Sequence, residues 1–331
     1  MTSEELSKLN RILIIRLSSL GDILLATPFI RSLKSKFPKI SIDVLIREDY
    51  ADTLKLNNYL DNLYFYNKDE QINKNLIESL KFNNYDFVID LQNNLRSRNI
   101  IKKLNKNVSR FYKLSFDKFL LVNFKINRLK SEENIPTRYA KTIKDFSLDN
   151  KRLDLFTDRF PDKKIAGKNN LIGICPGARH FTKRWPKENF IELGNKLSKD
   201  GFTILLFGGK SDRELCSEIY SQINGAIDLS NDNILLQTVA DMKLCKIIIC
   251  NDSGLMHVAS STNAKVIAIF GSTVKEFGFT PYKCDHLILE NNSLTCRPCS
   301  HIGRESCPKK HFECMKSIKP ETVFNKIQTL F

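Results

Sequence analysis

Three short polar turns carry the side chains of this sequence that are able to do chemistry. Each turn follows an apolar run and precedes a helix-like pattern. The first, RLSSLGD, places Asp22 after Ser18, Ser19 and a glycine, the second is CPGARHFTKRWP at 175–186, and the third is NDSGLMH at 251–257. Because the carboxyl ends of parallel strands meet at one edge of a sheet, turns in this position form the ligand sites of α/β proteins.

Asp22 in the first turn has two interpretations. Aspartate and serine at the start of a helix satisfy free backbone N–H groups, so Asp22 could simply cap the helix that follows. A carboxylate at the end of a strand can also take a proton from a hydroxyl group, which is the role of a general base. The turn by itself does not decide between these two roles.

The second turn has the composition of an anion site. Gly177 lets backbone N–H groups come close to an anion, and Arg179, Lys183 and Arg184 supply positive charge. Fixed donors and cations of this kind suit a diphosphate. An ordinary basic loop is the alternative, because glycine, arginine and lysine are common in loops.

The third turn combines a carboxylate with a helix start. Asp252 and Ser253 stand where a strand ends, Gly254 opens a helix, and His257 follows one turn later. A carboxylate can accept two hydrogen bonds from a diol, so the turn suits the hydroxyls of a sugar. A helix cap is again the simpler interpretation.

The elements that position these turns alternate between strand and helix. Such alternation predicts an α/β protein with two Rossmann-like domains, each built on a parallel sheet. We expect an N-terminal domain over 1–165 and a C-terminal domain over 166–331, with the last helix, from Pro320, crossing back to the first domain as one arrangement. The predicted strands are 12–15, 40–46, 63–66, 85–91, 171–175, 202–207, 226–229, 245–250 and 265–270, and the predicted helices include 23–36, 187–199, 212–223, 233–242, 255–262 and 320–331.

A polar stretch, QNNLRSR, follows the fourth predicted strand at 92–98. Its Asn93, Arg96 and Arg98 are candidates for holding an anionic acceptor, although surface loops often have this composition.

Composition and charge limit the class of protein. The 331 residues are 42% apolar and 27% charged, which is typical of a globular protein. No apolar run approaches the roughly 18 to 20 residues of a membrane span, and the acidic N-terminus has no apolar core of a signal peptide. We therefore expect a cytoplasmic protein.

Positive charge is concentrated in one segment. The formal net charge is +15, and residues 94–130 hold eleven basic residues against one acid, Asp117, with several aromatic residues between them. A basic and aromatic segment can lie on an anionic membrane, hold a phosphorylated acceptor or follow a nucleic acid. A solvated charged face is an equally good interpretation.

The nine cysteines all lie after residue 174, and four of them form a C-x2-C-x7-C-x6-C pattern. This spacing is typical of a structural zinc site, and a cluster of reduced thiols is the main alternative. Disulfides are less expected in a reducing cytoplasm. The four cysteines are Cys296, Cys299, Cys307 and Cys314.

Taken together, the motifs resemble a known family. RLSSLGDILLATP, CPGARHFTKRWP, LLFGG and NDSGLMHVA resemble, in order and spacing, the ADP-heptose:lipopolysaccharide heptosyltransferases of glycosyltransferase family 9, and the PGA…KRWP form is most similar to the heptosyltransferase II branch. The resemblance implies a GT-B fold, with two Rossmann-like domains facing across a cleft and the donor on the C-terminal one. It implies an inverting transferase that moves a heptose from ADP-heptose to the inner core of lipopolysaccharide, with no required cofactor or metal. Similar cysteine-rich tails occur in the family without a required metal.

The resemblance also assigns roles to residues. Asp22 would be the general base, and either Asp212 or Glu214 would contact the ribose. The donor site would comprise Gly177, Ala178, Lys183, Asp252, Ser253, Gly254, Leu255 and His257. Independently of the resemblance, the positions of Ser18, Ser19, Asn93, Arg96 and Arg98 after predicted strands make them candidates for acceptor contacts.

The expected partners are the nucleotide sugar, a phosphorylated lipopolysaccharide core and the anionic inner face of the inner membrane, where the protein would be peripheral. A transferase of the same fold with another sugar or acceptor is the main alternative, and the heptosyltransferase I, II and III roles are not separated. A dinucleotide oxidoreductase is disfavoured because the chain lacks G-x-G-x-x-G. A nucleic-acid-binding protein with a zinc knuckle would not need the acidic turns, and we expect no nucleic-acid partner.

Overall fold

The computed structural model describes residues 1–129 and 133–329, which form two compact units. Unit 1 comprises Met1–Leu114 and Glu133–Phe156, and unit 2 comprises Ser115–Glu132 and Thr157–Phe331, apart from the residues outside the described ranges. The sequence placed the division between the domains after residue 165, whereas the contacts divide the chain after Phe156. The contacts also assign the segment Ser115–Glu132 to unit 2. Lys130, the last of the basic residues in the 94–130 segment, lies outside the described residues.

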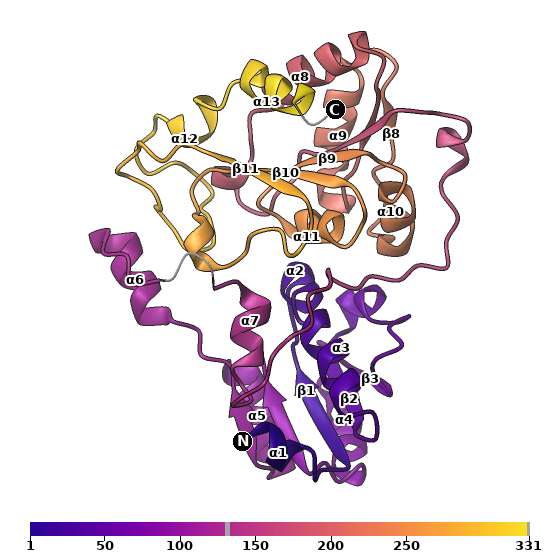
Figure 1. The fold of residues 1–331 in the computed structure, drawn as a ribbon, viewed down its shortest axis with the longest axis vertical. Coiled ribbons are helices and arrows are strands. Elements are labelled where there is room, and N and C mark those ends of the chain that lie inside the picture. The colour runs from indigo at the N-terminus through magenta and orange to yellow at the C-terminus, as the bar shows by residue number, and fades with distance from the viewer. Residues whose placement is uncertain (130–132, 330–331) are drawn as a thin grey trace. The chain divides into compact units, whose positions relative to one another are not determined.

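Unit 1 is built on a parallel sheet with the order β3-β2-β1-β4-β5 (Figure 1). The four strands expected from the sequence are confirmed, and β5 adds a three-residue edge strand too short to give an apolar pattern. The strands are β1 (Arg11–Ile15), β2 (Ser41–Arg47), β3 (Asn62–Tyr66), β4 (Phe87–Asp90) and β5 (Val108–Arg110).

Helices cover the sheet of unit 1 because alternate strand residues point to opposite faces. Leu13 and Ile15 of β1 share a buried cluster with apolar residues of α4 and α5. The helices are α1 (Ser3–Leu6), α2 (Leu20–Leu24), α3 (Thr27–Lys36), α4 (Glu70–Phe82), α5 (Leu95–Leu104) and α7 (Ile135–Ala140), with a 3-10 helix, η1, at Glu48–Thr53.

The helix predicted over 23–36 is two helices, α2 and α3. Pro28 lies at the start of α3. A proline inside a helix lacks the N–H donor and clashes with the carbonyl four residues earlier, here that of Leu24. The break leaves α2 as a short separate helix that carries Asp22.

Unit 2 has a second parallel sheet, with the order β11-β10-β9-β6-β7-β8. The two Rossmann-like units expected from the sequence are therefore confirmed. The strands are β6 (Leu171–Cys175), β7 (Thr203–Leu206), β8 (Ile227–Asp228), β9 (Ile247–Asn251), β10 (Lys265–Phe270) and β11 (His286–Glu290), of which β11 was not predicted.

The helices of unit 2 include α6, which the sequence did not assign. They are α6 (Ser115–Phe124), α8 (Lys187–Lys199), α9 (Arg213–Tyr220), α10 (Leu235–Met242), α11 (Gly254–Ser260), α12 (Glu313–Lys316) and α13 (Pro320–Gln328), with 3-10 helices η2 (Lys163–Ile165), η3 (Phe181–Lys183), η4 (Lys210–Asp212) and η5 (Lys275–Phe277). None of the described helices is long and apolar enough to cross a membrane.

The final helix packs within unit 2. The sequence allowed it to cross back to the first domain, but Val323 and Ile327 of α13 belong to the buried core that α8 forms with the second sheet. The predicted helix extended to residue 331, and residues 330–331 lie outside the described ranges.

In each sheet the strand order reverses beside the strand that comes first in the chain, which is β1 in unit 1 and β6 in unit 2. The reversal lies between β1 and β4 in unit 1 and between β6 and β9 in unit 2. Helices leave a sheet in opposite directions at such a point, and ligands of open α/β sheets bind there, outside the carboxyl ends of the strands. All three polar turns follow strands at these reversals.

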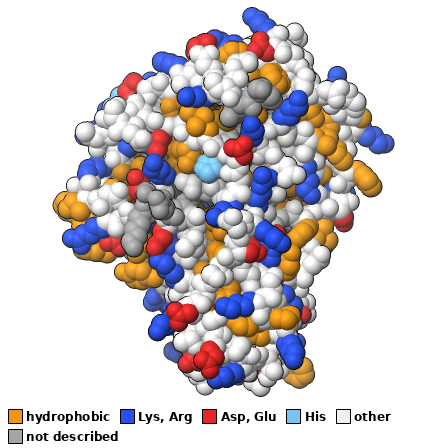
Figure 2. Space-filling view, viewed as in Figure 1, with side chains coloured by type: hydrophobic (Ala, Val, Ile, Leu, Met, Phe, Trp, Pro, Cys, Tyr) orange, Lys and Arg blue, Asp and Glu red, His pale blue; other side chains and the backbone are white. Residues whose placement is uncertain are grey.

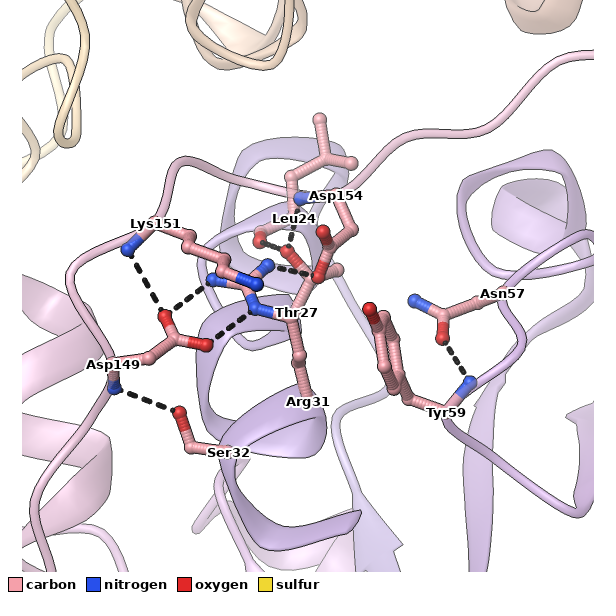
Figure 3. A network of polar contacts seen from close by, with 9 residues as sticks. All are labelled: Leu24, Thr27, Arg31, Ser32, Asn57, Tyr59, Asp149, Lys151 and Asp154. Atoms are coloured by element: carbon pink, nitrogen blue, oxygen red, sulfur yellow. Dashed lines mark hydrogen bonds and ion pairs between the residues drawn. The ribbon is translucent and has the colours of Figure 1, made fainter. Parts of the chain in front are cut away.

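A buried arginine network holds the last segment of unit 1 onto α3 (Figure 3). Arg31, only 3% exposed, binds both carboxylate oxygens of Asp149 at 2.7 Å and also pairs with Asp154. Asp149 N–H donates to Ser32 Oγ at 3.0 Å, and Asp154 N–H donates to Thr27 Oγ1 at 2.9 Å. Hydrogen bonding from Arg31 lowers the pKa of Asp149, whereas burial raises the pKa of Asp154. This network explains why residues up to Phe156 belong to unit 1.

Replacing Arg31 with methionine should destabilise unit 1 strongly, because it leaves two partly buried carboxylates without their cation. We expect the free energy of unfolding, measured by urea denaturation and circular dichroism, to fall by about 3 kcal/mol or more. The control is Lys81→Met, which breaks an exposed pair with Glu78 and should cost less than about 1 kcal/mol. Equal losses in the two variants would contradict the role given to Arg31.

Candidate functional site

Asp22 is bound from two sides at the end of β1. Its Oδ2 accepts hydrogen bonds from the Ser19 backbone N–H at 3.1 Å and the Ser19 hydroxyl at 2.7 Å. Its Oδ1 forms an ion pair with Arg16, and the Asp22 side chain is 19% exposed. The helix-cap interpretation is thus correct in part, and it leaves the carboxylate oriented and partly open to solvent.

Arg16 is a site residue that the sequence reasoning missed. It is the first residue after β1, and its guanidinium donates to Leu91 O at 2.6 Å and lies 5.7 Å from the ring centre of Tyr139. With its side chain 8% exposed, Arg16 is a buried cation whose carboxylate partner is Asp22. The available signal was a charged residue, Arg16, directly after the apolar run ILII.

The stretch after β4 lies at the same edge as the first turn. Gln92 Oε1 accepts from the Ser18 backbone N–H at 3.1 Å, which joins the two turns directly. Arg98 donates to Asn93 Oδ1 at 3.0 Å, so two of the predicted acceptor residues are in contact. Arg96 is exposed on the first turn of α5.

Lys113 adds a second cation that had been counted only as part of the basic segment. Burial lowers the pKa of Lys113, and the nearby Arg16 and Arg98 lower it further, against the raising effect of Asp90 and Asp22. The Lys113 ammonium therefore interacts electrostatically with both Arg16 and Asp22. The unit 1 site therefore combines one oriented carboxylate with several cations.

In unit 2, the second and third turns meet through an ion pair. Lys183 Nζ lies 2.6 Å from Asp252 Oδ2, with the two side chains 16% and 7% exposed. Thr273 Oγ1 donates to the same oxygen at 2.6 Å. An ammonium has three donors, so Lys183 can bind Asp252 and an anionic ligand together. Thr273, in the turn after β10, was not predicted, although GST after an apolar run was a usable signal.

A buried amide fixes the same two turns against each other. Asn251, the last residue of β9, accepts from the Trp185 backbone N–H at 3.0 Å and donates to Pro176 O at 2.7 Å. Asn251 is fully buried and Trp185 is 2% exposed. The amide thereby sets the position of Lys183, two residues before Trp185.

The structure distinguishes Asp212 from Glu214. A methyl group added to Gly177 would overlap the Asp212 carboxylate, so Asp212 lies directly on the glycine of the second turn. Burial raises the pKa of Asp212, while a hydrogen bond from the Gly209 N–H and the nearby Arg184 oppose the rise. Glu214 is exposed on α9.

The remaining predicted donor residues differ in accessibility. The Ser253 hydroxyl is buried with no hydrogen-bond partner among the described residues, and Gly254 and Leu255 are half-buried beside it. Ala178 is 6% exposed, and its carbonyl accepts from Arg184 Nε at 2.7 Å. His257 is only 3% exposed inside α11, so any ligand contact by this side chain stays a prediction.

Comparison with known proteins decides the family. The model described as glycosyltransferase family 9 (heptosyltransferase) matches residues 74–310, well over half of the chain. The chain belongs to glycosyltransferase family 9.

Individual relatives agree with this membership. The lipooligosaccharide heptosyltransferase 2 of Campylobacter jejuni is 33% identical over 172 residues, covering 50% of this chain and 53% of the relative, so the match spans about half of that protein. A family 9 glycosyltransferase of Veillonella parvula has a TM-score of 0.77 at 22% identity and covers 97% of each chain. The ADP-heptose lipopolysaccharide heptosyltransferase II of E. coli has a TM-score of 0.73 at 23% identity and covers 97% of this chain and 98% of its own. The fold is accordingly of the GT-B type.

In this family 9 chain the cysteine-rich segment contacts the second turn and the turn that carries Thr273. Arg297, 8% exposed, donates to Gly271 O at 2.6 Å and Thr273 O at 2.9 Å and pairs with Glu290 at 2.8 Å. Arg304 N–H donates to Thr182 Oγ1 at 2.8 Å, next to Lys183. The segment thus holds both partners of Asp252.

The four clustered cysteines, with His311, line one small cavity. All four cysteines are free thiols. Burial raises the pKa of Cys314 to about 11, which keeps that thiol protonated at neutral pH. Cys296 Sγ lies 3.9 Å from His311 Nε2. Within the described ranges, no group of three or more His, Cys, Asp or Glu is arranged to hold a metal ion. The zinc site stays a prediction from the spacing of the cysteines.

Replacing Asn251 with alanine should destabilise unit 2 without touching a surface residue. The substitution leaves the Trp185 N–H and the Pro176 carbonyl buried without partners, which should cost about 2 kcal/mol or more. Trp185 is the one tryptophan of the sequence, so its fluorescence follows unfolding at this site directly. Asn325→Ala, at an exposed position of α13, should change stability by less than about 0.5 kcal/mol. A loss for N251A no larger than this control would rule out the bridging role.

Proposed function

We propose that this chain is an inverting glycosyltransferase that moves a heptose from ADP-heptose to a sugar of the lipopolysaccharide inner core. The observation that carries the proposal is the convergence of Lys183, Asp252 and Thr273 on one point of unit 2 in a family 9 chain. A cation beside a carboxylate suits a ligand with a diphosphate at one end and sugar hydroxyls at the other. Support for the particular sugar comes from relatives that are named heptosyltransferases.

In the proposed reaction, the acceptor hydroxyl attacks the anomeric carbon of the donor. Asp22 takes the proton of that hydroxyl as the new carbon–oxygen bond forms. The bond between the anomeric carbon and the β-phosphate oxygen breaks, and ADP leaves with the electron pair. Attack opposite the leaving group inverts the configuration at this carbon.

The cations of unit 2 stabilise the leaving group. Lys183 would hold the diphosphate with the N–H groups that Asp252 does not use, and fixed charges of this kind act without reorganisation during the reaction. Asp252 and the Ser253 hydroxyl would then bind the sugar. Asp212, which lies against Gly177, would contact the ribose in preference to the exposed Glu214. Because protein cations supply this charge, we propose that no metal is required.

Unit 1 would hold the acceptor. Arg16 orients the Asp22 carboxylate, and the cations Arg98 and Lys113 suit a phosphorylated core saccharide. The side chains of Ser18 and Asn93 would supply neutral hydrogen bonds to the acceptor. We further propose that the protein works in the cytoplasm as a peripheral protein at the inner face of the inner membrane, where such an acceptor is anchored.

A donor screen tests the proposal. The protein is incubated with ADP-heptose, ADP-glucose or a UDP-sugar, with and without a truncated core saccharide, and nucleotide release is measured in the presence of EDTA. We expect acceptor-dependent release of ADP from ADP-heptose. Faster release from another nucleotide sugar would overturn the heptose assignment, and release only after addition of a divalent cation would overturn the metal-independent chemistry.

Asp22→Asn should abolish turnover while leaving donor binding nearly unchanged. The amide keeps the shape of the side chain but cannot accept the proton, so kcat should fall by about 10²- to 10⁴-fold. The Kd for ADP, from isothermal titration calorimetry, should stay within about twofold. The matched control is Asp158→Asn at an exposed position. Full turnover in D22N would remove Asp22 from the base role.

Lys183→Met should weaken the binding of ADP itself. Loss of a hydrogen bond to a charged group costs about 1.5 to 3 kcal/mol, which corresponds to a Kd raised by about 10- to 150-fold. Lys187→Met removes an exposed lysine of α8 that pairs with Glu218 and should leave the Kd unchanged. Trp185 fluorescence checks that both variants are folded. If the two variants bind ADP equally well, Lys183 does not hold the diphosphate.

A further inference from the structure

Helix α6 presents its aromatic side chains to solvent. Phe116, Phe119 and Phe124 are 61%, 52% and 61% exposed, and Ile126 just beyond the helix is 48% exposed. Phe119 and Phe124 contact each other edge to face, with ring centres 5.9 Å apart, so the rings form one patch. A helix on a protein surface usually buries its apolar face and exposes its charges. Here Leu121 is the buried residue of α6.

Two lysines connect α6 and the residue that follows it to the rest of unit 2. Lys125 Nζ donates to Pro298 O at 2.7 Å and to Cys296 O at 3.3 Å. Lys118 Nζ lies 5.8 Å from the ring centre of Phe279. These lysine contacts and the buried Leu121 face unit 2, while the rings stay exposed to solvent.

The surface around the rings is positively charged and partly apolar. His301 lies close enough to Lys118 for that charge to lower its pKa, in addition to the effect of burial, and the next residue, Ile302, is 55% exposed. Arg304 is exposed and donates to Cys299 O at 2.9 Å, beside the carbonyls that Lys125 binds. Arg128 is exposed after the helix. Figure 2 shows a similar mixture of apolar and basic side chains on the face that it draws.

We propose that α6 and residues 301–304 form a docking surface for an anionic lipid bilayer. Aromatic rings enter the boundary between headgroups and acyl chains, and neighbouring cations attract anionic headgroups; membrane-surface helices combine these two features. A protein partner would need a matching shape and hydrogen bonds, whereas exposed rings with nearby cations match the chemistry of a charged bilayer. The inference rests on the proposed function for its purpose, because a lipid-anchored acceptor lies in such a membrane.

Flotation of the full chain with vesicles tests the docking surface. The vesicles contain phosphatidylcholine alone or phosphatidylcholine with phosphatidylglycerol. We expect binding to the anionic vesicles to be at least about tenfold stronger, and to weaken in high salt. Equal binding to the two kinds of vesicle, or to neither, would overturn the proposal.

The decisive variant is Phe116→Ser, Phe119→Ser and Phe124→Ser together. It should bind anionic vesicles at least about 100-fold more weakly, because the three rings supply the apolar area that inserts. The matched control is Phe82→Ser with Phe160→Ser, which removes two rings that are 91% and 88% exposed elsewhere. Unchanged thermal melting and Trp185 fluorescence check the fold. Vesicle binding lost equally in the control, or retained in the triple variant, would contradict the proposal.

Two further measurements separate this inference from the proposed function and from self-association. With a soluble core saccharide, the triple variant should turn over as fast as the unchanged protein, since docking is not needed. Absence of turnover in the unchanged protein would defeat the proposed function but leave the vesicle result standing. The unchanged protein could instead form a dimer in gel filtration, fail to bind vesicles, and become a monomer in the triple variant. That result would make this face a contact between copies of the chain.

Discussion

The parallel direction of the strands is the constraint on which the two sites depend. Every described strand pairing is parallel, so each strand needs a crossover helix and all the carboxyl ends of a sheet open onto one edge. At a reversal of strand order, the helices leave in opposite directions and space remains for turns. Polar residues far apart in the chain, such as Ser18 and Gln92, meet there because their turns follow the carboxyl ends of neighbouring parallel strands.

Each site is preformed by an ion pair of limited exposure. Asp22 is paired with Arg16 in unit 1, and Asp252 is paired with Lys183 in unit 2. A charge removed from water is costly unless it is paired, so each partner stabilises the other in one orientation. In both pairs one group retains capacity for a ligand: Asp22 is partly exposed, and Lys183 has N–H donors to spare.

The cysteine-rich segment connects two features that are separate in the sequence. Through Arg297 it fixes the turn that carries Thr273, and through its carbonyls it binds Lys125, the residue after α6. Its described contacts account for a structural role through arginine and backbone groups. The same segment thereby contacts both the candidate site of unit 2 and the residue that follows the aromatic helix that we assign to lipid.

The sequence by itself determined the two Rossmann-like units, the positions of the three turns and the family, because apolar periodicity and short motifs are local properties of a chain. It left Asp22 open between cap and base, and it could not choose between Asp212 and Glu214. The break between α2 and α3 could have been read from Pro28, which is a local signal. Only the tertiary structure revealed Arg16, Lys113 and Thr273 as neighbours of the predicted residues. It also decided which side of α6 faces solvent. These features depend on strand order, on burial and on contacts between distant residues, and local patterns do not encode any of the three.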